Sequence, residues 1–238
     1  MVKLLKAGIL TAVLVVPALI FLYLRAFGEN QYTLRRYYPL TDSTEQVLLK
    51  ANPAARFFEP KEDTVFHVIP PFQLVNQDGK ETTETALRGK IHVADFFFSR
   101  CESICPKLSA QLSRVQEVFS VNPAIQLVSY TVDPDHDTPD VLRRYASEYD
   151  ARPGKWLFLT GNKTQLYHLA QKGYFVPVLA EGDGNEKPNE TFTHSEKLVL
   201  VDKAGIIRGY YDGTDKKEVD RLILEIRVLL EIYEKQKS

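Results

Sequence analysis

The sequence predicts an α/β protein in which a sandwich of strands and helices follows one N-terminal membrane-spanning helix. Three observations indicate this fold class: a long apolar run at the N-terminus, two near-continuous apolar strands that alternate with helical patterns, and a hairpin followed by an amphipathic helix at the C-terminus. Strands that alternate with helices are typical of a layered α/β domain.

The first element is an unbroken apolar stretch from Ala7 to Leu24. Its length corresponds to about 27 Å of helix, close to the hydrocarbon thickness of a bilayer. Lys3 and Lys6 precede it on a very short N-terminal side, so the positive-inside rule places the rest of the chain outside the cytoplasm. A cleavable signal peptide is the alternative, but the run is longer than a usual signal core. We expect residues 1–28 to form an uncleaved anchor, which gives a single-pass protein of the bacterial inner membrane with a periplasmic domain.

Residues 29–65 mix polar residues, prolines and aromatic pairs without a sustained period, and we expect a spacer that partly packs on the domain. The globular domain is expected over residues 66–238. It opens with a short strand within Pro70–Lys80 that ends in an Asp78-Gly79 turn, which predicts an N-terminal hairpin.

The central part of the domain is predicted to hold two buried strands, each followed by a helix. Ile91–Phe98 and Ile125–Val132 are near-continuous apolar runs, typical of strands buried on both faces of a mainly parallel sheet. Pro106 begins a helix with apolar residues at helical spacing. Thr138 and Pro139 predict a second helix start, with a hydroxyl cap and a proline at the first helical position.

The C-terminal part completes the sandwich. We expect a strand, a helix, a hairpin and a final amphipathic helix, in the order Trp156–Leu159, Thr164–Lys172, Lys197–Val201 with Ile206–Tyr211, and a helix from Lys216. Together the elements indicate a thioredoxin-like sandwich with an added N-terminal hairpin.

Cys101 and Cys105 are the two cysteines of the chain, and they lie where a buried strand runs into a helix. A disulfide that closes so short a loop constrains the unfolded state little, so a purely structural bridge is a poor explanation. Redox chemistry or a soft metal explains the pair better. The formal net charge of −1, with 26% charged residues, gives no electrostatic footprint for nucleic acid.

The position of the two thiols favours ionisation. Pro106 disfavours helical geometry at Cys105, so we expect both thiols in the loop before the helix. Unpaired amides and the helix dipole there stabilise a thiolate and lower the thiol pKa. Two thiolates and one imidazole suit Cu(I), and accept Cu(II) with a further ligand. Zinc is the competing metal for such a ligand set, but nothing nearby in the sequence suggests a hydrolytic site.

Four motifs in the expected order resemble the SCO/SenC family of copper proteins, and they span nearly all of the domain: DFFFSRCESICP (95–106), TVDPDHDTP (131–139), LTG (159–161) and THS (193–195). The resemblance implies a thioredoxin-like fold, an N-terminal tether and one copper per chain, Cu(I) or Cu(II), bound by Cys101, Cys105 and His194. It also implies assembly of the dinuclear copper site of cytochrome c oxidase, with the copper-site subunit of a terminal oxidase as partner. Thr193 and Glu102 depart from the family, which often has Asp and Pro at these positions.

His194 is far from the cysteines in sequence, so its assignment depends on the fold. In a thioredoxin fold the loop before the penultimate hairpin lies against the dithiol, and redox members usually place a cis-proline there. This chain has Thr193-His194-Ser195 instead, which favours a metal ligand.

The other histidines are expected to be ordinary. His67 and His92 precede or begin strands and are expected at a sheet edge or half-buried, and His168 lies within a helix. His136 lies among Asp133, Asp135 and Asp137, so an accessory metal position is the alternative there. We favour a turn in which the carboxylates accept hydrogen bonds from backbone amides.

Two functions from different classes follow. A copper metallochaperone, which is not an enzyme, needs all three ligands. An extracytoplasmic thiol-disulfide oxidoreductase, which acts on cysteines of a copper protein and is served by a thiol reductant protein, needs only Cys101 and Cys105. Three residues between the cysteines favour the chaperone. A thiol peroxidase is a more distant third, because Ser99 and Arg100 only loosely imitate its activating residues.

Overall fold

The computed structural model describes residues 11, 13, 15–23, 33–53, 61–178 and 195–235. The chain divides into two compact units, residues 1–33 and 34–238. In the first unit the described residues 15–23 are helical. None of the helices built from described residues combines the length and apolar character needed to cross a bilayer.

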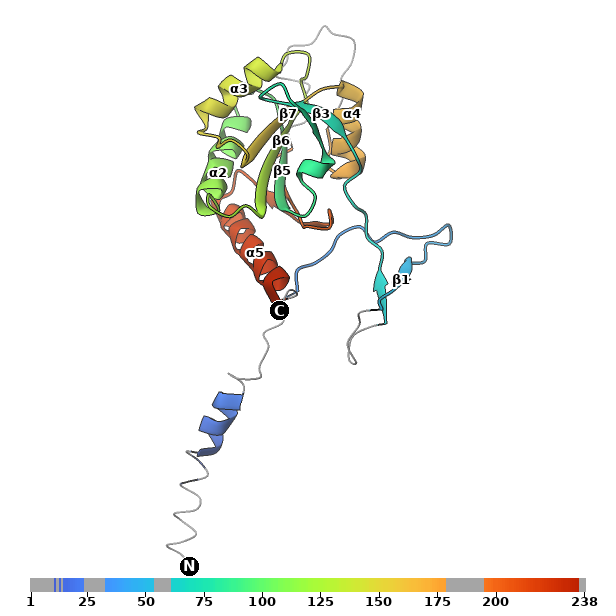
Figure 1. The fold of residues 1–238 in the computed structure, drawn as a ribbon, viewed down its shortest axis with the longest axis vertical. Helices are drawn as coiled ribbons and strands as arrows, with labels where there is room; N and C mark the ends of the chain where they lie inside the picture. Colours follow the sequence, from blue (N-terminus) through green and yellow to red (C-terminus); the bar gives the residue numbers. More distant parts are fainter. Residues whose placement is uncertain are drawn as a thin grey trace, which may run out of the picture. The chain divides into compact units, whose positions relative to one another are not determined.

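The second unit is built on a seven-stranded sheet with the order β4-β3-β7-β6-β5-β8-β9 (Figure 1). The strands β5, β6 and β7 are parallel, and an antiparallel hairpin extends this core on each side. The bounds are β3 (Gln73–Asn76), β4 (Glu81–Thr83), β5 (Ile91–Phe97), β6 (Ile125–Thr131), β7 (Trp156–Thr160), β8 (Lys197–Val201) and β9 (Ile207–Asp212). The predicted buried strands and both hairpins are confirmed.

Strands β5 and β6 fix where the functional loops emerge. Every residue of both strands is buried, and their register runs from Ile91 opposite Ile125 to Phe97 opposite Thr131. Because the two parallel strands end level with each other, the loops that follow them leave the sheet at the same edge. The first of these loops carries Cys101, and the second carries Asp133, His136 and Asp137.

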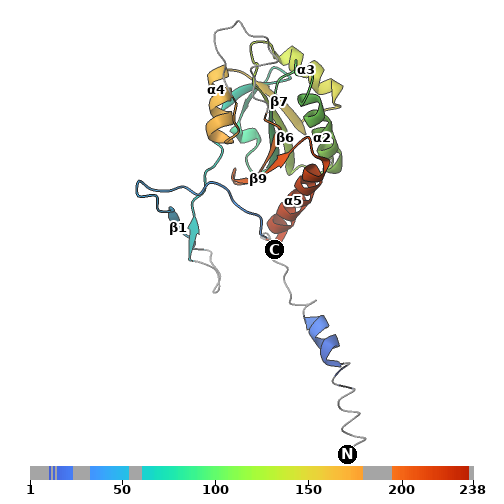
Figure 2. The same ribbon diagram turned by 180° about the vertical axis from the view of Figure 1, so that it is seen from behind.

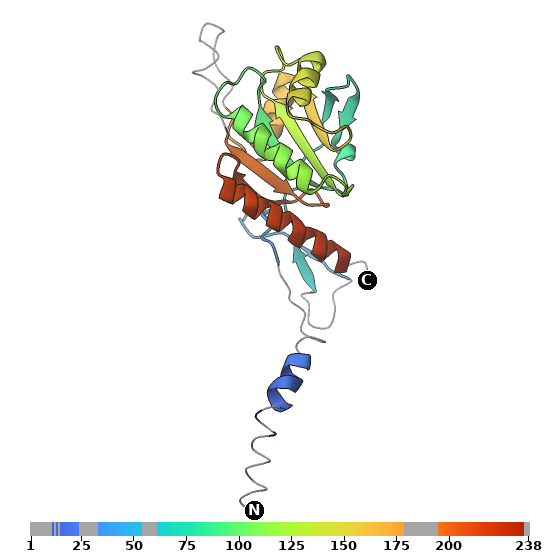
Figure 3. The same cartoon turned by 90° about the vertical axis from the view of Figure 1, so that its left-hand side faces the viewer.

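Helices cover both faces of the sheet. One face carries α2 (Cys105–Val118), α3 (Pro139–Glu148) and α5 (Lys216–Lys235), and the other carries α4 (Lys163–His168), as Figures 2 and 3 show. A π-helical turn, η2 (Leu169–Gly173), continues α4, and a short 3₁₀ turn, η1 (Glu84–Ala86), follows β4. The predicted cap of α3 is confirmed, because the Thr138 side chain accepts a hydrogen bond from the Val141 amide at 3.5 Å and Pro139 begins the helix.

The segment before the domain contains more structure than its composition suggests. An antiparallel pair, β1 (Leu49–Ala51) and β2 (Glu62–Thr64), forms within the stretch that showed no period. All three side chains of β1 are exposed. The pair is therefore held mainly by backbone hydrogen bonds, which leave no hydrophobic pattern in the sequence.

A buried arginine holds the start of this segment to the sheet. The Arg208 guanidinium, on β9, pairs with Asp202 at 2.8 Å and donates to the carbonyls of Leu34 at 2.7 Å and Arg35 at 2.9 Å. The Tyr37 amide donates to Ile207 at 3.1 Å. The chain is thus fastened to β9 before β1 begins.

Candidate metal centre

The two cysteines lie at the junction of β5 and α2. Cys101 is in the loop, while Cys105 is the first residue of α2, with Ile104 at the N-cap position. The expectation that both thiols lie in the loop is therefore wrong for Cys105. Pro106, in the first turn, costs no helical hydrogen bond because the first amides of a helix have no intrahelical acceptor. Both thiols are free, and the two residues are only 5% and 3% exposed.

Cys101 is the acceptor of the pair. The Cys105 amide donates to the Cys101 sulfur at 3.3 Å, and the Ser103 hydroxyl lies 3.8 Å from it. The Cys105 thiol hydrogen bond is the largest cause that lowers the pKa of Cys101, to about 4, with further help from the amides of residues 103–105 and against the effect of burial. This lowered pKa favours the thiolate form of Cys101 at neutral pH, which is the direction that the sequence predicts.

Cys105 behaves in the opposite way. Its thiol donates to Cys101, and this hydrogen bond together with burial raises the pKa of Cys105 well above its usual range. The helix N-terminus does not ionise both sulfurs, because a second negative charge beside the first is unfavourable. The dithiol thus carries one negative charge and one transferable proton.

His194 and Thr193 lie outside the described residues, so the structure does not place the predicted third ligand. The strand that follows them is informative. β8 runs antiparallel to β5, with Ala94 opposite Val199 and His92 opposite Val201. The start of β8 therefore lies toward the sheet edge where β5 ends and the dithiol loop emerges. Ser195, the first described residue on this side, is buried.

Three residues of the acidic loop after β6 could each offer a metal-ligand atom: Asp133, His136 and Asp137. These three atoms lie within 4.8 Å of one another. Other residues already occupy the carboxylates of this loop. Asp137 accepts from Ser99 and Thr131, and Asp133 pairs with Arg100. These partners support a loop-stabilising turn, although the donors include side chains as well as the amides expected from the sequence.

Asp95 is a buried carboxyl group that the sequence analysis did not single out. It is 1% exposed in the middle of β5, where the Ser129 hydroxyl donates to one of its oxygens and the Trp156 indole donates to Ser129 at 2.9 Å. Burial raises the pKa of Asp95 to about 7. Its signal in the sequence is a single carboxyl group in a strand whose other residues, apart from His92, are apolar.

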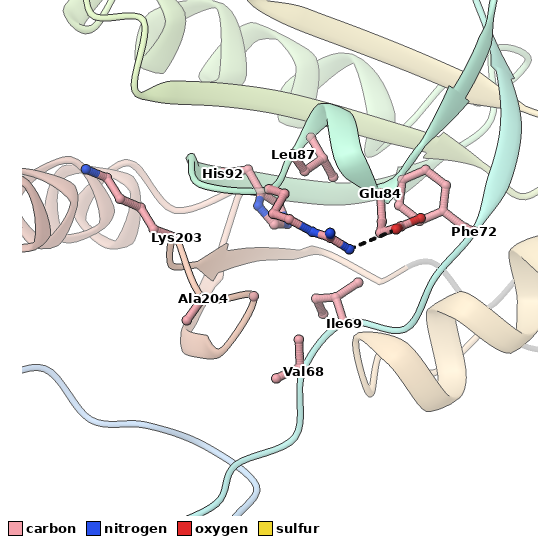
Figure 4. A pocket seen from close by; sticks show the side chains of 10 residues that line it. Val68, Ile69, Phe72, Glu84, Leu87, His92, Lys203 and Ala204 are labelled. Carbon is pink, nitrogen blue, oxygen red and sulfur yellow. Dashed lines mark hydrogen bonds and ion pairs between the residues drawn. The ribbon is translucent and has the colours of Figure 1, made fainter. Parts of the chain in front are cut away.

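A small cavity lies at the other end of β5, away from the dithiol (Figure 4). It has a volume of about 80 Å³ and is lined by Ile69, Leu87 and His92 among others. His92 is buried in the centre of the sheet rather than at its edge, which corrects the expectation. Its Nε2 shares a hydrogen bond with the Tyr174 hydroxyl at 3.1 Å, and burial lowers the pKa of His92 to about 3.

The remaining histidines fit the ordinary positions expected of them. His67 is half-buried, with its Nε2 at 2.9 Å from the Gly173 carbonyl oxygen. His168 is exposed at the end of α4. Neither lies in the loops next to the dithiol.

Comparison with known proteins agrees with this geometry. The SCO1/SenC family model matches residues 60–231, which include both cysteines, the acidic loop and the start of β8. The chain belongs to the SCO1/SenC family. Among its relatives is the SCO1 protein homolog of Bacillus subtilis, 29% identical over 168 residues that cover 70% of this chain and 84% of the relative.

Solved structures of the SCO1/SenC family show the same fold. BsSco, described as a member of the Sco family of cytochrome c oxidase assembly proteins with a disulfide switch, is 28% identical with a TM-score of 0.59, over 70% of this chain and 95% of that one. Yeast Sco1, solved with copper bound, is 30% identical with a TM-score of 0.54, over 68% of this chain and 89% of that one. The predicted thioredoxin-like α/β fold is confirmed.

Proposed function

We propose that this protein is a copper metallochaperone that assists the assembly of the dinuclear copper site of cytochrome c oxidase. It binds one copper ion through Cys101, Cys105 and His194. The observation that carries the proposal is the dithiol itself, in which two buried sulfurs share one negative charge at a helix N-terminus. Family membership, and the copper bound to yeast Sco1, support the choice of metal.

The described residues fit a soft, low-coordinate cation. Cys101 offers an ionised sulfur without prior loss of a proton, and Cys105 releases its proton when it becomes a second ligand. The burial of both residues excludes water and oxygen ligands, which favours Cu(I) over harder ions. Copper, when bound, is the cargo that the partner oxidase subunit receives.

The place of His194 in the ligand set rests on the topology. Only residues 195 and 196 separate His194 from β8 in the sequence, and β8 begins toward the edge where the dithiol loop emerges. An imidazole supplied there would complete a set of two thiolates and one nitrogen. We propose that His194 is this third ligand.

A Cu(I) titration of the reduced, full-length chain in detergent tests the proposal. We expect one tight equivalent in the wild type and at least tenfold weaker binding for His194→Ala, since a lost ligand costs about 1.4 kcal/mol or more. His168→Ala is the control, because His168 is exposed at the end of α4 and lies outside the loops next to the dithiol. Unchanged binding by His194→Ala, or an equal loss for His168→Ala, would contradict the ligand set.

A thiol-disulfide oxidoreductase is the second candidate, favoured by the low pKa of Cys101. A thiolate of this kind attacks a disulfide, and Cys105 then resolves the mixed disulfide with release of the reduced substrate thiols. The protein is left oxidised and needs a thiol reductant for another cycle. Reduction of a disulfide peptide by the protein, dependent on both cysteines and indifferent to His194→Ala, would favour this function over copper delivery.

We also propose that residues 1–28 anchor the chain in the bacterial inner membrane, that 29–65 form a spacer, and that 66–238 form the periplasmic copper-binding domain. The support is the apolar run from Ala7 to Leu24 with lysines before it. Protein that remains in membranes after alkaline carbonate washing, and that is digested by protease added to spheroplasts, is the expected result. Release by carbonate would contradict the anchor.

A further inference from the structure

The loop that carries Cys101 has no regular structure of its own. Between Phe97 and Cys105 the chain forms only turns and bends. Within it, the Cys101 amide donates to the Phe98 carbonyl at 3.2 Å. The acceptor bonds of the Cys101 sulfur come from residues 103–105 of the same loop and the following helix turn. The position of that sulfur therefore depends on how the loop is held.

Two acidic residues of the neighbouring loop hold it. Ser99 is bound by Asp137, and Arg100 is bound by Asp133. The arginine pair is the weaker link, because the Arg100 side chain is 42% exposed and water screens such pairs. In the second contact, Asp137 is fully buried and Ser99 is partly buried, so water has less access to this carboxylate.

Asp137 holds Ser99 with both of its carboxylate oxygens. The Ser99 amide donates to Oδ2 at 3.1 Å, and the Ser99 hydroxyl donates to Oδ1. The Thr131 hydroxyl and the His136 Nδ1–H complete the set of four donors, the latter at 3.0 Å. This arrangement fixes the backbone and the side chain of the residue at which the loop leaves β5.

Asp137 is itself fixed in place. Its amide donates to the Asp133 carbonyl at 2.9 Å. Thr131, whose hydroxyl donates to Asp137, is the last residue of β6. Thr138, the residue after Asp137, caps α3. Through Asp137, the loop with Cys101 is therefore attached to the end of β6 and to the start of α3, both of which are rigid elements.

Simple packing does not account for a charge at this position. An ionised carboxylate is costly to bury, and an apolar residue of similar size would fill the space at lower cost. What the carboxylate adds is directed, charge-assisted hydrogen bonding to an amide and a hydroxyl at the same time. An amide side chain would place a donor group against these donors.

We propose that Asp137 is a positioning residue for the dithiol: through Ser99, its carboxylate fixes the loop geometry in which the Cys101 sulfur receives the Cys105 amide. The proposal deepens, and rests on, the proposed copper-binding function. Asp137 does not contact the metal in this proposal, and it acts only through the loop.

Asp137→Asn in the reduced, metal-free, full-length protein tests the proposal. Hydrogen exchange of a peptide spanning residues 98–105 measures the loop, and competition with a chromophoric chelator measures Cu(I) affinity. We expect loop exchange at least tenfold faster and Cu(I) affinity at least tenfold weaker, as for the loss of a charge-assisted hydrogen bond. Exchange in β9 should stay at the wild-type rate.

Two controls separate positioning from general destabilisation. Asp135→Asn changes an exposed carboxylate of the same loop, which pairs with Lys163 at 3.4 Å, and should alter neither readout. Leu229→Ala removes a buried side chain of α5 and lowers the melting temperature without touching the loop or its anchors. If Asp137→Asn lowers the melting temperature but leaves both readouts at wild-type values, or if Leu229→Ala changes them equally, the proposal is wrong.

Ser99→Ala covers the case in which Asp137→Asn does not fold. It removes only the hydroxyl of the pair, and should speed loop exchange by about threefold to tenfold. Loop exchange needs no metal, so it decides the positioning proposal even if the wild type fails to bind Cu(I), a result that would contradict the copper function alone. Exchange of Ser99→Ala at the wild-type rate would overturn the proposal.

Discussion

At the scale of single residues, the two thiols differ because one donates the hydrogen bond that the other accepts. The Cys101 sulfur accepts hydrogen bonds from the thiol and the amide of Cys105, which lowers the pKa of Cys101. The pKa of Cys105 is raised, so its thiol stays protonated. A metal ion therefore meets one thiolate at once and has to displace one proton. This division sets the pH behaviour of the site before any metal is present.

Removal of the Cys105 thiol tests this division. In the wild type we expect the rate of alkylation by iodoacetamide to be flat between pH 6 and pH 8, because the pKa of Cys101 lies at about 4. Cys105→Ala removes the largest cause of that low pKa, so its alkylation rate should rise with pH in this range. Cys101→Ala gives the background from Cys105, and a flat profile for Cys105→Ala would contradict the assignment.

Asp95 makes a second prediction at this scale, on stability. Its pKa is raised from 3.8 in the unfolded chain to about 7 in the fold by burial, so its contribution to stability is present below pH 3.8 and is lost as pH rises through 7. Asn imitates the protonated form. Relative to Asp95→Asn, the wild type should lose up to about 4 kcal/mol of unfolding free energy between pH 4 and pH 8.

Urea unfolding of both proteins across this pH range measures the difference. Ser129→Ala is a useful companion, because it removes the hydroxyl that donates to Asp95 and should raise the pKa of that carboxyl further. A constant difference between wild type and Asp95→Asn at all pH values would show that Asp95 ionises normally.

At the scale of elements, the cap of α3 links the acidic loop to a helix. Thr138→Ala removes the side-chain acceptor of the Val141 amide, and should cost about 0.5–1 kcal/mol of unfolding free energy. The low end is expected because the bond is long, at 3.5 Å. Chemical denaturation measures the change, with Thr164→Ala, exposed within α4, as the control. Equal stabilities for Thr138→Ala and wild type would mean that the cap contributes nothing.

Most of the elements were predictable from the sequence, because burial leaves a pattern. The near-continuous apolar runs of β5 and β6 predict a buried parallel pair, and Thr138 with Pro139 predicts a helix start. The strands β1 and β2 leave no such pattern, since their side chains are largely exposed and backbone pairing holds them together.

The site was predictable in its sulfurs and less so in their electrostatics. The spacing of Cys101 and Cys105 indicates a dithiol, but which sulfur receives the Cys105 amide depends on loop geometry that sequence alone does not specify. The same holds for Asp137, whose four donors come from three separate segments of the chain. His194 remains a prediction, because it lies outside the described residues.

At the scale of the whole molecule, Arg208 joins the N-terminal segment to the sheet. Its guanidinium is buried between Asp202 and the carbonyls of Leu34 and Arg35. Arg208→Met leaves the Asp202 carboxylate buried without its cation, and should cost about 3–5 kcal/mol. It should also speed tryptic cleavage after Arg35 and Arg36, because the segment loses its attachment.

Thermal unfolding and limited proteolysis measure these two effects. Arg143→Met is the matched control, because Arg143 forms an exposed pair with Asp140, and its loss should change stability by less than about 1 kcal/mol. Tryptic cleavage of Arg208→Met at the wild-type rate would show that other contacts hold the segment.

The attachment at Arg208 also limits how far the domain can move from the membrane. If the apolar run that ends at Leu24 is held in the bilayer, the tether of the domain extends from Leu24 to Leu34, whose carbonyl is bound by Arg208 of β9. Ten residues at full extension reach at most about 35 Å. The domain cannot deliver copper to a site that lies farther from the membrane than the tether and the domain together extend. The attachment at Arg208 therefore limits which partners the domain can reach.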